Sequence, residues 1–348
     1  MRICIFGAGA IGGFIGVLLA RAGHDVSFVA RGAHLAAMRT HGARLLIDGE
    51  ELLAGVPCTD QPAELGMQDF VFLTVKAHSV PAAVDSIVPL LGPQTAIVTA
   101  VNGIPYWYLH GHGGPLAGAA LECIDPGGRQ LELFGAARAI GCVTNPAADV
   151  VAPGVIRHVH GRKFPIGEAD GRHTERIERL HRAMQDAGLE APIRRDIRDE
   201  IWLKLWGNVC LSPVSALTHA TLDVVATDPG TRGVCRAIMA EARRVGEAIG
   251  IRFRVDAERR LDGAAAVGPH KISMLVDLES GRPMEIDPIV SAVQEIGARL
   301  GIATPAIDIV AALIKLRQRT AQQAPAGPAP HPGNVGTAGQ SVRGGESG

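Results

Sequence analysis

The chain has 348 residues, enough for two domains of ordinary size. Apolar residues make up 47% and charged residues 20%, so a sizeable core is available and global disorder is excluded. The formal net charge of -1 argues against a nucleic-acid-binding protein and a polybasic membrane protein, because both need a strong positive field. The 43 glycines favour an α/β protein with tight turns.

The cysteines and histidines give no sign of a metal site. The six cysteines form no C-x-x-C pair, so reduced thiols in a cytoplasmic protein are expected rather than a zinc ribbon or a disulfide framework. Two histidine pairs, His110-Gly-His112 and His158-Val-His160, could each contribute to a site, but no acidic cluster lies beside either. The sequence therefore predicts no bound metal.

The first 30 residues predict a strand–turn–helix–strand unit. Residues 3–20 are uncharged and mostly apolar, as in a signal peptide or a short membrane span, but five glycines interrupt the run. A β-rich run at 3–6 precedes the first glycines, and a helical pattern follows at 11–21. The segment 25–29 has the pattern of a second strand.

Three glycines in this unit, Gly7, Gly9 and Gly12, have the spacing G-x-G-x-x-G. Between a strand and a helix, this spacing predicts a dinucleotide-binding turn, with the pyrophosphate at the helix N-terminus. At the end of the second strand, where NAD enzymes usually carry a carboxylate for the ribose hydroxyl, the chain carries Arg31. Because a guanidinium binds a 2′-phosphate, NADP(H) is predicted, with a solvated surface arginine as the alternative.

The first half continues as an α/β alternation. Two apolar runs, 69–75 and 96–101, read as buried parallel strands, and Lys76 and Asn102 follow them directly. Since ligands bind at the carboxyl ends of parallel strands, both side chains are candidates for a binding site. Further strands are predicted near 139–144, 154–160 and 163–166, and a helix at 174–187.

After about residue 195 the pattern becomes helical. The helices are predicted at 199–209 leading into 211–217, and at 231–249, 270–278, 289–300 and 306–319. We therefore predict an N-terminal Rossmann NADP-binding domain over 1–195 with an inserted segment near 106–135, an all-helical domain for substrate binding and catalysis over 196–321, and a disordered tail over 322–348.

The helical half carries candidate chemistry. Lys204 and Asn208 are four residues apart, so they share one helix face. A lysine among apolar neighbours is costly unless it faces a polar cleft, where partial burial would lower its pKa toward that of a useful acid. A snorkelling lysine is the alternative. Glu285 taken alone is better explained as a capping or surface carboxylate.

Six motifs together resemble the ketopantoate reductase family, over about residues 2–318. They are Gly7-x-Gly9-x-x-Gly12, Val75-Lys76-Ala77, Val101-Asn102-Gly103, Glu200-Ile-Trp-x-Lys204-Leu-x-x-Asn208, Ser273-Met274-Leu275-x-Asp277 and Glu285-Ile-Asp287. The resemblance implies a Rossmann domain followed by a helical domain, with NADPH and substrate between them. It also implies reduction of 2-dehydropantoate to pantoate, a step of pantothenate and coenzyme A biosynthesis.

The resemblance also implies roles for particular residues. Lys204 would be the catalytic acid at the ketone, and Glu285 would lie beside it. The cofactor would contact Gly7, Gly9, Ala10, Ile11, Gly12, Arg31, Lys76 and Asn102. The substrate would contact Asn102, Asn208, Ser212 and Ser273.

The sequence departs from the family pattern in three places. Ser212 and His270 stand where the family often has asparagine. The segment 106–135, which begins Tyr106-Trp107-Tyr108, is longer than the usual connection and has two readings: a surface flap or dimer contact, or a lid over the cleft that alters substrate choice. A dehydrogenase of another branched or aromatic 2-hydroxy acid and a non-catalytic NADP-sensing protein stay open as alternatives, as does a homodimer.

Overall fold

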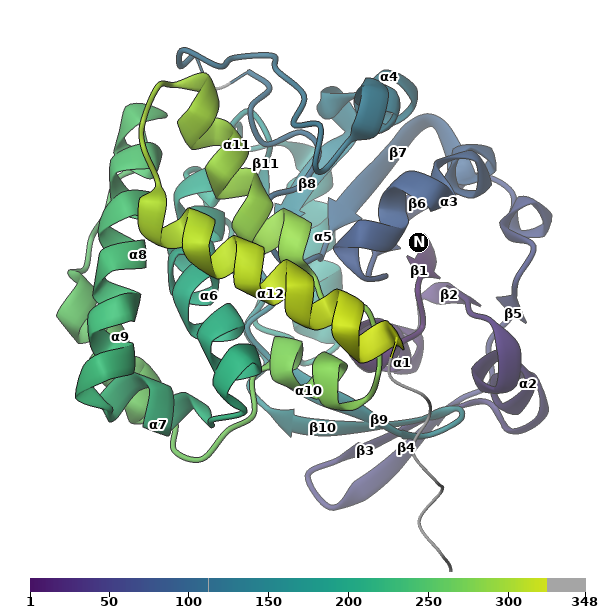
Figure 1. The fold of residues 1–348 in the computed structure, drawn as a ribbon. Helices are drawn as coiled ribbons and strands as arrows, with labels where there is room; N and C mark the ends of the chain where they lie inside the picture. Colours follow the sequence, from purple (N-terminus) through teal and green to yellow (C-terminus); the bar gives the residue numbers. More distant parts are fainter. Residues whose placement is uncertain (112, 324–348) are drawn as a thin grey trace, which may run out of the picture.

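The computed structural model describes residues 1–111 and 113–323. A seven-stranded, mostly parallel sheet forms its N-terminal part (Figure 1). In spatial order its strands are β11 (Ile166–Glu168), β8 (Ala139–Cys142), β7 (Leu91–Thr99), β6 (Gln68–Leu73), β1 (Arg2–Phe6), β2 (Asp25–Val29) and β5 (Cys58–Thr59). Only β11 runs antiparallel to its neighbour. With α1 (Ala10–Arg21) between β1 and β2, the predicted strand–turn–helix–strand unit is confirmed.

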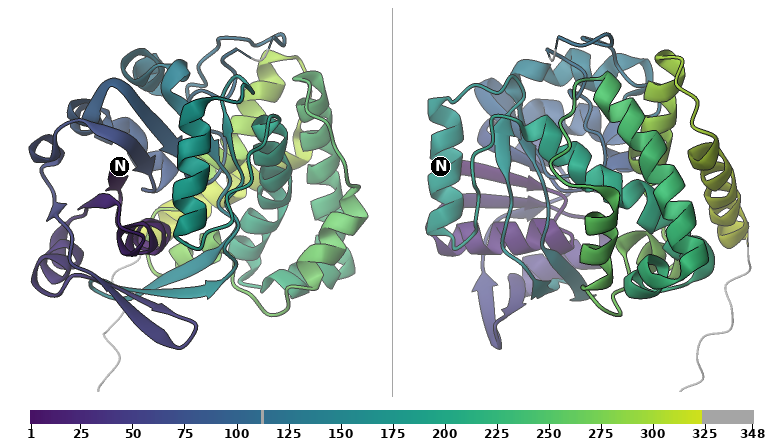
Figure 2. Two further views of the ribbon diagram at one scale, coloured as in Figure 1. Left: turned by 180° about the vertical axis from the view of Figure 1, so that it is seen from behind. Right: turned by 90° about the vertical axis from the view of Figure 1, so that its left-hand side faces the viewer.

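Apolar side chains project from both faces of this sheet, because successive residues of a strand point to opposite sides. In β1, Ile3 and Ile5 belong to one core with α1 and α5 (Glu175–Asp186), whereas Cys4 and Phe6 face a second core. That second core contains α3 (Val80–Ile87) and most of the C-terminal helices. The sheet is therefore covered on both faces, and the helical region lies to one side of it (Figure 2).

A second sheet, which the sequence analysis does not predict as a sheet, packs on α1 (Figure 1). Its strands are β4 (Glu50–Ala54), β3 (Ala43–Ile47), β10 (Val155–His160) and β9 (Ala147–Ala152). A Cβ atom on Gly13 would lie 2.6 Å from the Ile156 side chain, so α1 needs glycine where this sheet meets it. The strand predicted at 154–160 is thus present, but it belongs to this sheet.

The strand predicted at 163–166 is shifted to Ile166–Glu168. Lys163 forms only an isolated bridge with Glu190, and Pro165 has no N–H to donate to a neighbouring strand. The strand predicted at 139–144 ends earlier, at Cys142. The remaining N-terminal helices are α2 (Gly32–His41) and α4 (Arg129–Phe134).

The C-terminal region is helical, as predicted. It contains α6 (Ile197–Thr218), α7 (Leu222–Thr227), α8 (Pro229–Ala248), α9 (Ala257–Ala265), α10 (Ser273–Glu279), α11 (Ala292–Arg299) and α12 (Pro305–Gln323). The two segments predicted at 199–209 and 211–217 form the single helix α6, which continues through Pro213. An α/β fold with a helical C-terminal region is therefore confirmed.

Helix α12 continues to Gln323 and so includes the first residues of the predicted tail. The rest of that tail, residues 324–348, lies outside the described residues, as does His112. In the part of the chain that the structure describes, no helix is long and apolar enough to cross a membrane. The predicted domain boundaries stay predictions.

The segment 106–135 was predicted to be either a surface flap or dimer contact, or a lid over the cleft. Neither interpretation fits its aromatic residues at 106–108. Trp107 is 0% exposed, and Tyr106 and Tyr108 are also buried. The Trp107 Nε1 donates a hydrogen bond to Thr99 Oγ1 at 3.0 Å, and the Tyr108 ring stacks on Trp202 of α6. These apolar rings therefore join the sheet to α6 in the core, and they form neither a lid nor a surface flap.

Candidate active site

The glycine-rich turn after β1 packs so closely against its neighbours that Gly7 and Gly12 have no room for a side chain. Gly7 has φ +111°, and a Cβ atom on it would lie 2.6 Å from the Val75 backbone nitrogen. A Cβ atom on Gly12 would lie 2.1 Å from the Gly7 carbonyl oxygen. Beside Gly9, in contrast, no atom lies within 4 Å of the corresponding position. The turn thus leaves open space at Gly9, at the N-terminus of α1, where free N–H groups can receive a pyrophosphate.

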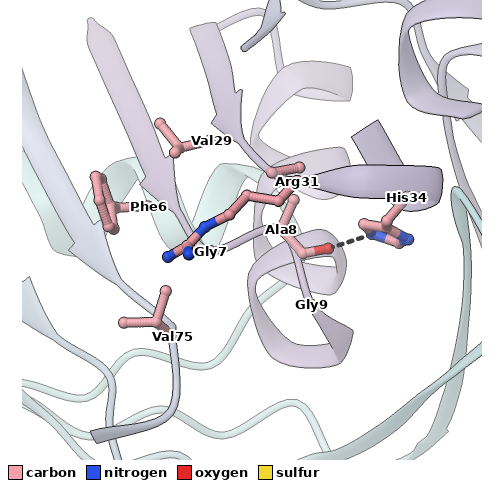
Figure 3. A pocket seen from close by; sticks show the side chains of 9 residues that line it. Phe6, Gly7, Ala8, Gly9, Val29, Arg31, His34 and Val75 are labelled. Carbon is pink, nitrogen blue, oxygen red and sulfur yellow. Dashed lines mark hydrogen bonds between the residues drawn. The ribbon is translucent and has the colours of Figure 1, made fainter. Parts of the chain in front are cut away.

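A cavity of about 180 Å³ lies against this turn (Figure 3). It is lined by Phe6, Gly7, Ala8, Gly9, Val29, Ala30, Arg31, His34 and Val75. The exposed Arg31 side chain extends across the cavity. Of the predicted cofactor residues, Gly7, Gly9 and Arg31 line the cavity, whereas Ala10, Ile11 and Gly12 lie in the first turn of α1.

His34 is a residue of this cavity that the sequence analysis missed. Its Nδ1 accepts a hydrogen bond from the Gly154 N–H at 2.9 Å, so its Nε2 is the donor to the Ala8 carbonyl at 2.7 Å. His34 therefore ties the glycine-rich turn to the connection between β9 and β10 of the second sheet. Figure 3 shows its bond to Ala8. No spacing or motif in the sequence marks this histidine, since both of its partners are backbone groups.

Lys76 and Asn102 follow β6 and β7, which are neighbouring parallel strands, so they lie at the same edge of the sheet as the glycine-rich turn. The Lys204 Nζ reaches this edge from α6, where it donates hydrogen bonds to Asn102 Oδ1 at 2.7 Å and to the Thr144 carbonyl. The structure thus brings together three predicted site residues from distant parts of the chain.

The ammonium group of Lys204 has an unusual environment. Burial lowers its pKa to about 8, and the positive charge of Arg260 acts in the same direction. The negative charge of Glu285 opposes this shift. At neutral pH the lysine is therefore protonated, but it releases its proton far more easily than an exposed lysine does.

Glu285 is only 4% exposed, so it is not the surface carboxylate that its sequence position alone suggests. Its carboxylate accepts hydrogen bonds from the Ala77 N–H at 2.9 Å and from Asn102 Nδ2 at 3.2 Å. Lys76 Nζ lies 3.5 Å from it. Asn102 therefore links Lys204, through its amide oxygen, to Glu285, through its amide nitrogen.

A π-helical turn, Asp287–Ser291, follows Glu285 and meets the sheet edge closely. The Pro288 carbonyl accepts a hydrogen bond from the Ile104 N–H at 2.9 Å. A Cβ atom on Gly103, which has φ +82°, would lie 2.1 Å from that same carbonyl oxygen. Only glycine therefore allows this approach, which holds Glu285 next to Asn102. Such single π turns are frequent at functional sites.

Asp277 is a second buried carboxylate, to which the sequence analysis assigned no role. It is 2% exposed and lies 2.5 Å from Lys76 Nζ and 3.0 Å from Arg282 Nε. Its only signal in the sequence is its place in the Ser273–Asp277 motif. Lys76 is therefore held between two carboxylates of the helical region, a position that its place after β6 alone does not reveal.

The other predicted substrate residues lie on α6 and α10. Asn208 is half-buried one turn after Lys204, and Ser212 is 1% exposed one further turn along. Ser273 is exposed at the start of α10, which packs on α6. His270 packs edge-on against His160, with 6.0 Å between the ring centroids. Among the described residues, no group of His, Cys, Asp and Glu could hold a metal ion.

Comparison with known proteins identifies the family of this fold and site. Residues 3–171 match the family model for ketopantoate reductase PanE/ApbA, and residues 196–318 match the model for its C-terminal part. The chain belongs to the ketopantoate reductase family. It is therefore an oxidoreductase.

Relatives and solved structures agree with this membership. The chain is 53% identical to a 2-dehydropantoate 2-reductase of Mesorhizobium japonicum, over 90% of this chain and 97% of that protein. A crystal structure of a ketopantoate reductase homologue from Ralstonia solanacearum MolK2 has a TM-score of 0.88 at 40% identity, covering 92% of this chain and 98% of that one. A D-mandelate dehydrogenase shares the fold, with a TM-score of 0.80 at 20% identity over 92% of this chain and 99% of that one.

Proposed function

We propose that this protein reduces 2-dehydropantoate to pantoate, with NADPH as the preferred cofactor, as a step of pantothenate and coenzyme A biosynthesis. The observation that carries the proposal is the half-buried Lys204, linked through Asn102 to Glu285. This arrangement belongs to a chain that is 53% identical to a 2-dehydropantoate 2-reductase and covers 97% of that protein.

The residues around the glycine-rich turn fit a dinucleotide. Gly7 and Gly12 make the turn tight, Gly9 leaves the backbone accessible, and the cavity beside it is lined by Arg31. Because no carboxylate stands at the end of β2, a ribose 2′-hydroxyl has no acidic partner there, whereas Arg31 offers a guanidinium to a 2′-phosphate. NADPH, when bound, supplies the hydride for the reduction.

Lys204 is the proposed acid at the ketone oxygen. An ammonium group has three N–H donors, and two of these are used by Asn102 and Thr144. In the described part of the chain the third has no acceptor, so it is available to polarise a carbonyl and then to give it a proton. The nearby Glu285 charge favours the protonated lysine, which keeps the acid loaded at neutral pH.

Asn102 is proposed to orient this acid. Its amide oxygen is held toward Lys204 because its amide nitrogen donates to Glu285. Asn208, Ser212 and Ser273 are proposed contacts for the rest of the substrate, on the strength of the family resemblance and of their place on α6 and α10.

Burial of Trp107 removes the part of the argument for a bulkier substrate that rested on an aromatic lid over the cleft. An aromatic lid over the cleft would have favoured an apolar or aromatic keto acid, but this ring lies in the core. The bonded arrangement of Lys204, Asn102 and Glu285 also favours an enzyme over a non-catalytic NADP-sensing protein.

The test is the initial rate of NADPH oxidation against a panel of 2-keto acids: 2-dehydropantoate, a branched aliphatic keto acid and an aromatic one. We expect kcat/KM to be highest for 2-dehydropantoate, and Lys204→Ala to lower kcat by about 10²–10⁴-fold, the usual effect of a positioned acid. Lys163→Ala, a change of an exposed lysine, is the matched control. A higher kcat/KM for another keto acid would change the proposed substrate. If the protein turns over none of the keto acids, the proposal is overturned.

A further inference from the structure

Gly207 lies in the interior of the 22-residue helix α6, where glycine destabilises a helix relative to alanine. Its surroundings give the reason. A Cβ atom on Gly207 would lie 3.0 Å from Arg260 Nε and 3.1 Å from its Nη2. The guanidinium of Arg260, which comes from α9, therefore rests against the backbone of α6, and any side chain at 207 would press on it.

This contact places a positive charge beside the proposed acid. Gly207 follows Lys204 by three residues and precedes Asn208, so all three share one face of α6. Burial is the main cause of the lowered pKa of Lys204, and the charge of Arg260 adds a smaller effect in the same direction, which agrees with this placement. Arg260 as a whole residue is exposed, while its guanidinium is partly buried where it meets α6.

Arg260 has no counter-ion in the part of the chain that the structure describes. The neighbouring carboxylates of α9 are already used: Glu258 pairs with Arg232 and Arg236, and Asp262 pairs with Arg232. No described carboxylate lies within ion-pair distance of the Arg260 guanidinium, and no described group accepts a hydrogen bond from it. Burial lowers its pKa, but a guanidinium stays protonated in proteins.

We propose that Arg260 binds the carboxylate of the substrate. This inference rests on the proposed function. In a 2-keto acid the carboxylate is bonded to the ketone carbon, so a group that binds it must lie close to the group that polarises the ketone oxygen. A guanidinium suits a carboxylate because it can form two parallel hydrogen bonds.

The other cations of the site are less suited to this role. Lys204 is needed at the ketone, and Lys76 is already held by Asp277 and Glu285. The substrate contacts that the resemblance implies on α6 and α10, such as Asn208 and Ser273, are uncharged. Arg260 supplies the positive charge that an anionic substrate requires.

The test compares Arg260→Gln and Arg260→Lys with Arg259→Gln, which changes the adjacent, exposed arginine of the same helix. Loss of a charge-assisted hydrogen bond predicts that Arg260→Gln raises the KM for 2-dehydropantoate by about 10- to 150-fold. The KM for NADPH should not change, Arg260→Lys should be intermediate, and Arg259→Gln should resemble the unmodified protein. Calorimetric binding of the product hydroxy acid should weaken by a similar factor in Arg260→Gln.

Two outcomes separate this inference from the proposed function. If the unmodified protein reduces keto acids and Arg260→Gln matches Arg259→Gln in KM and in product binding, the carboxylate role is wrong and the proposed function stands. If the unmodified protein reduces no keto acid, both fall. A general folding defect in Arg260→Gln is recognised by a rise in the NADPH KM together with loss of helical circular dichroism. If Arg260→Gln has that defect and Arg260→Lys leaves the KM for 2-dehydropantoate unchanged, the carboxylate role is also wrong.

Discussion

Raising the pH from 7 to 9 should remove most of the reductase activity. The reason is Lys204, whose pKa is lowered to about 8 by burial. With that pKa the lysine is about 90% protonated at pH 7 and about 10% protonated at pH 9, so kcat/KM for the keto acid should fall about 10-fold. An exposed lysine would still be almost fully protonated at pH 9.

The sign of this change follows from the role of the group. Reduction needs the protonated lysine as an acid, so activity is present below the pKa and lost above it. Oxidation of the hydroxy acid needs the neutral amine as a base, so its rate should rise over the same pH range. A lysine with only a structural role would not make the rate of reduction fall and the rate of oxidation rise over the same pH range.

Two variants should move the profile in opposite directions. Glu285→Gln removes the negative charge that raises the pKa of Lys204, so activity should be lost at a lower pH. Arg260→Gln removes a positive charge that lowers it, so activity should persist to a higher pH. Initial rates at saturating NADPH in overlapping buffers measure both, with Lys163→Ala as control. A profile of the unmodified protein that stays flat from pH 7 to 9.5 would refute the assignment of Lys204 as the acid.

Three further substitutions test other parts of the molecule. Arg31→Ala should weaken NADPH binding by about 10- to 150-fold and leave NADH binding nearly unchanged, and equal losses in a titration would show that Arg31 does not bind the phosphate. Trp107→Ala should lower the free energy of unfolding by about 3–5 kcal/mol in urea, because the ring is fully buried, without changing the preference among keto acids. Gly207→Ala should stabilise α6 by up to ~1 kcal/mol yet raise the KM for the keto acid, and a stabilised variant with an unchanged KM would argue against the site at Arg260.

The parts of the fold that sequence predicted are those set by local patterns. A β-rich apolar run and the spacing of three glycines predicted β1, α1 and β2, and helical periodicity predicted most of the C-terminal region. The second sheet was missed as a unit because its central pairing joins β3 to β10, more than 100 residues later. No local sequence pattern indicates the pairing of strands so far apart in the chain.

The candidate site divides in the same way. Lys76, Asn102 and Lys204 could be proposed from the ends of strands and the face of a helix, which are local features. His34, Asp277 and Arg260 were not assigned roles, because the groups that they contact are backbone groups or side chains from other elements. The aromatic residues 106–108 were misread because an apolar run beside a cleft and one inside the core have the same sequence signature.

The polar contacts of the site also hold the two parts of the molecule together. Glu285, from the helical region, accepts hydrogen bonds from the Ala77 N–H and from Asn102, both of which belong to the sheet edge. Asp277 does the same for Lys76. Because buried carboxylates are stable only when such partners satisfy them, the α/β part and the helices dock in the one arrangement that completes these bonds. That same arrangement brings Lys204 to Asn102, so the contacts that dock the two parts also complete the proposed site.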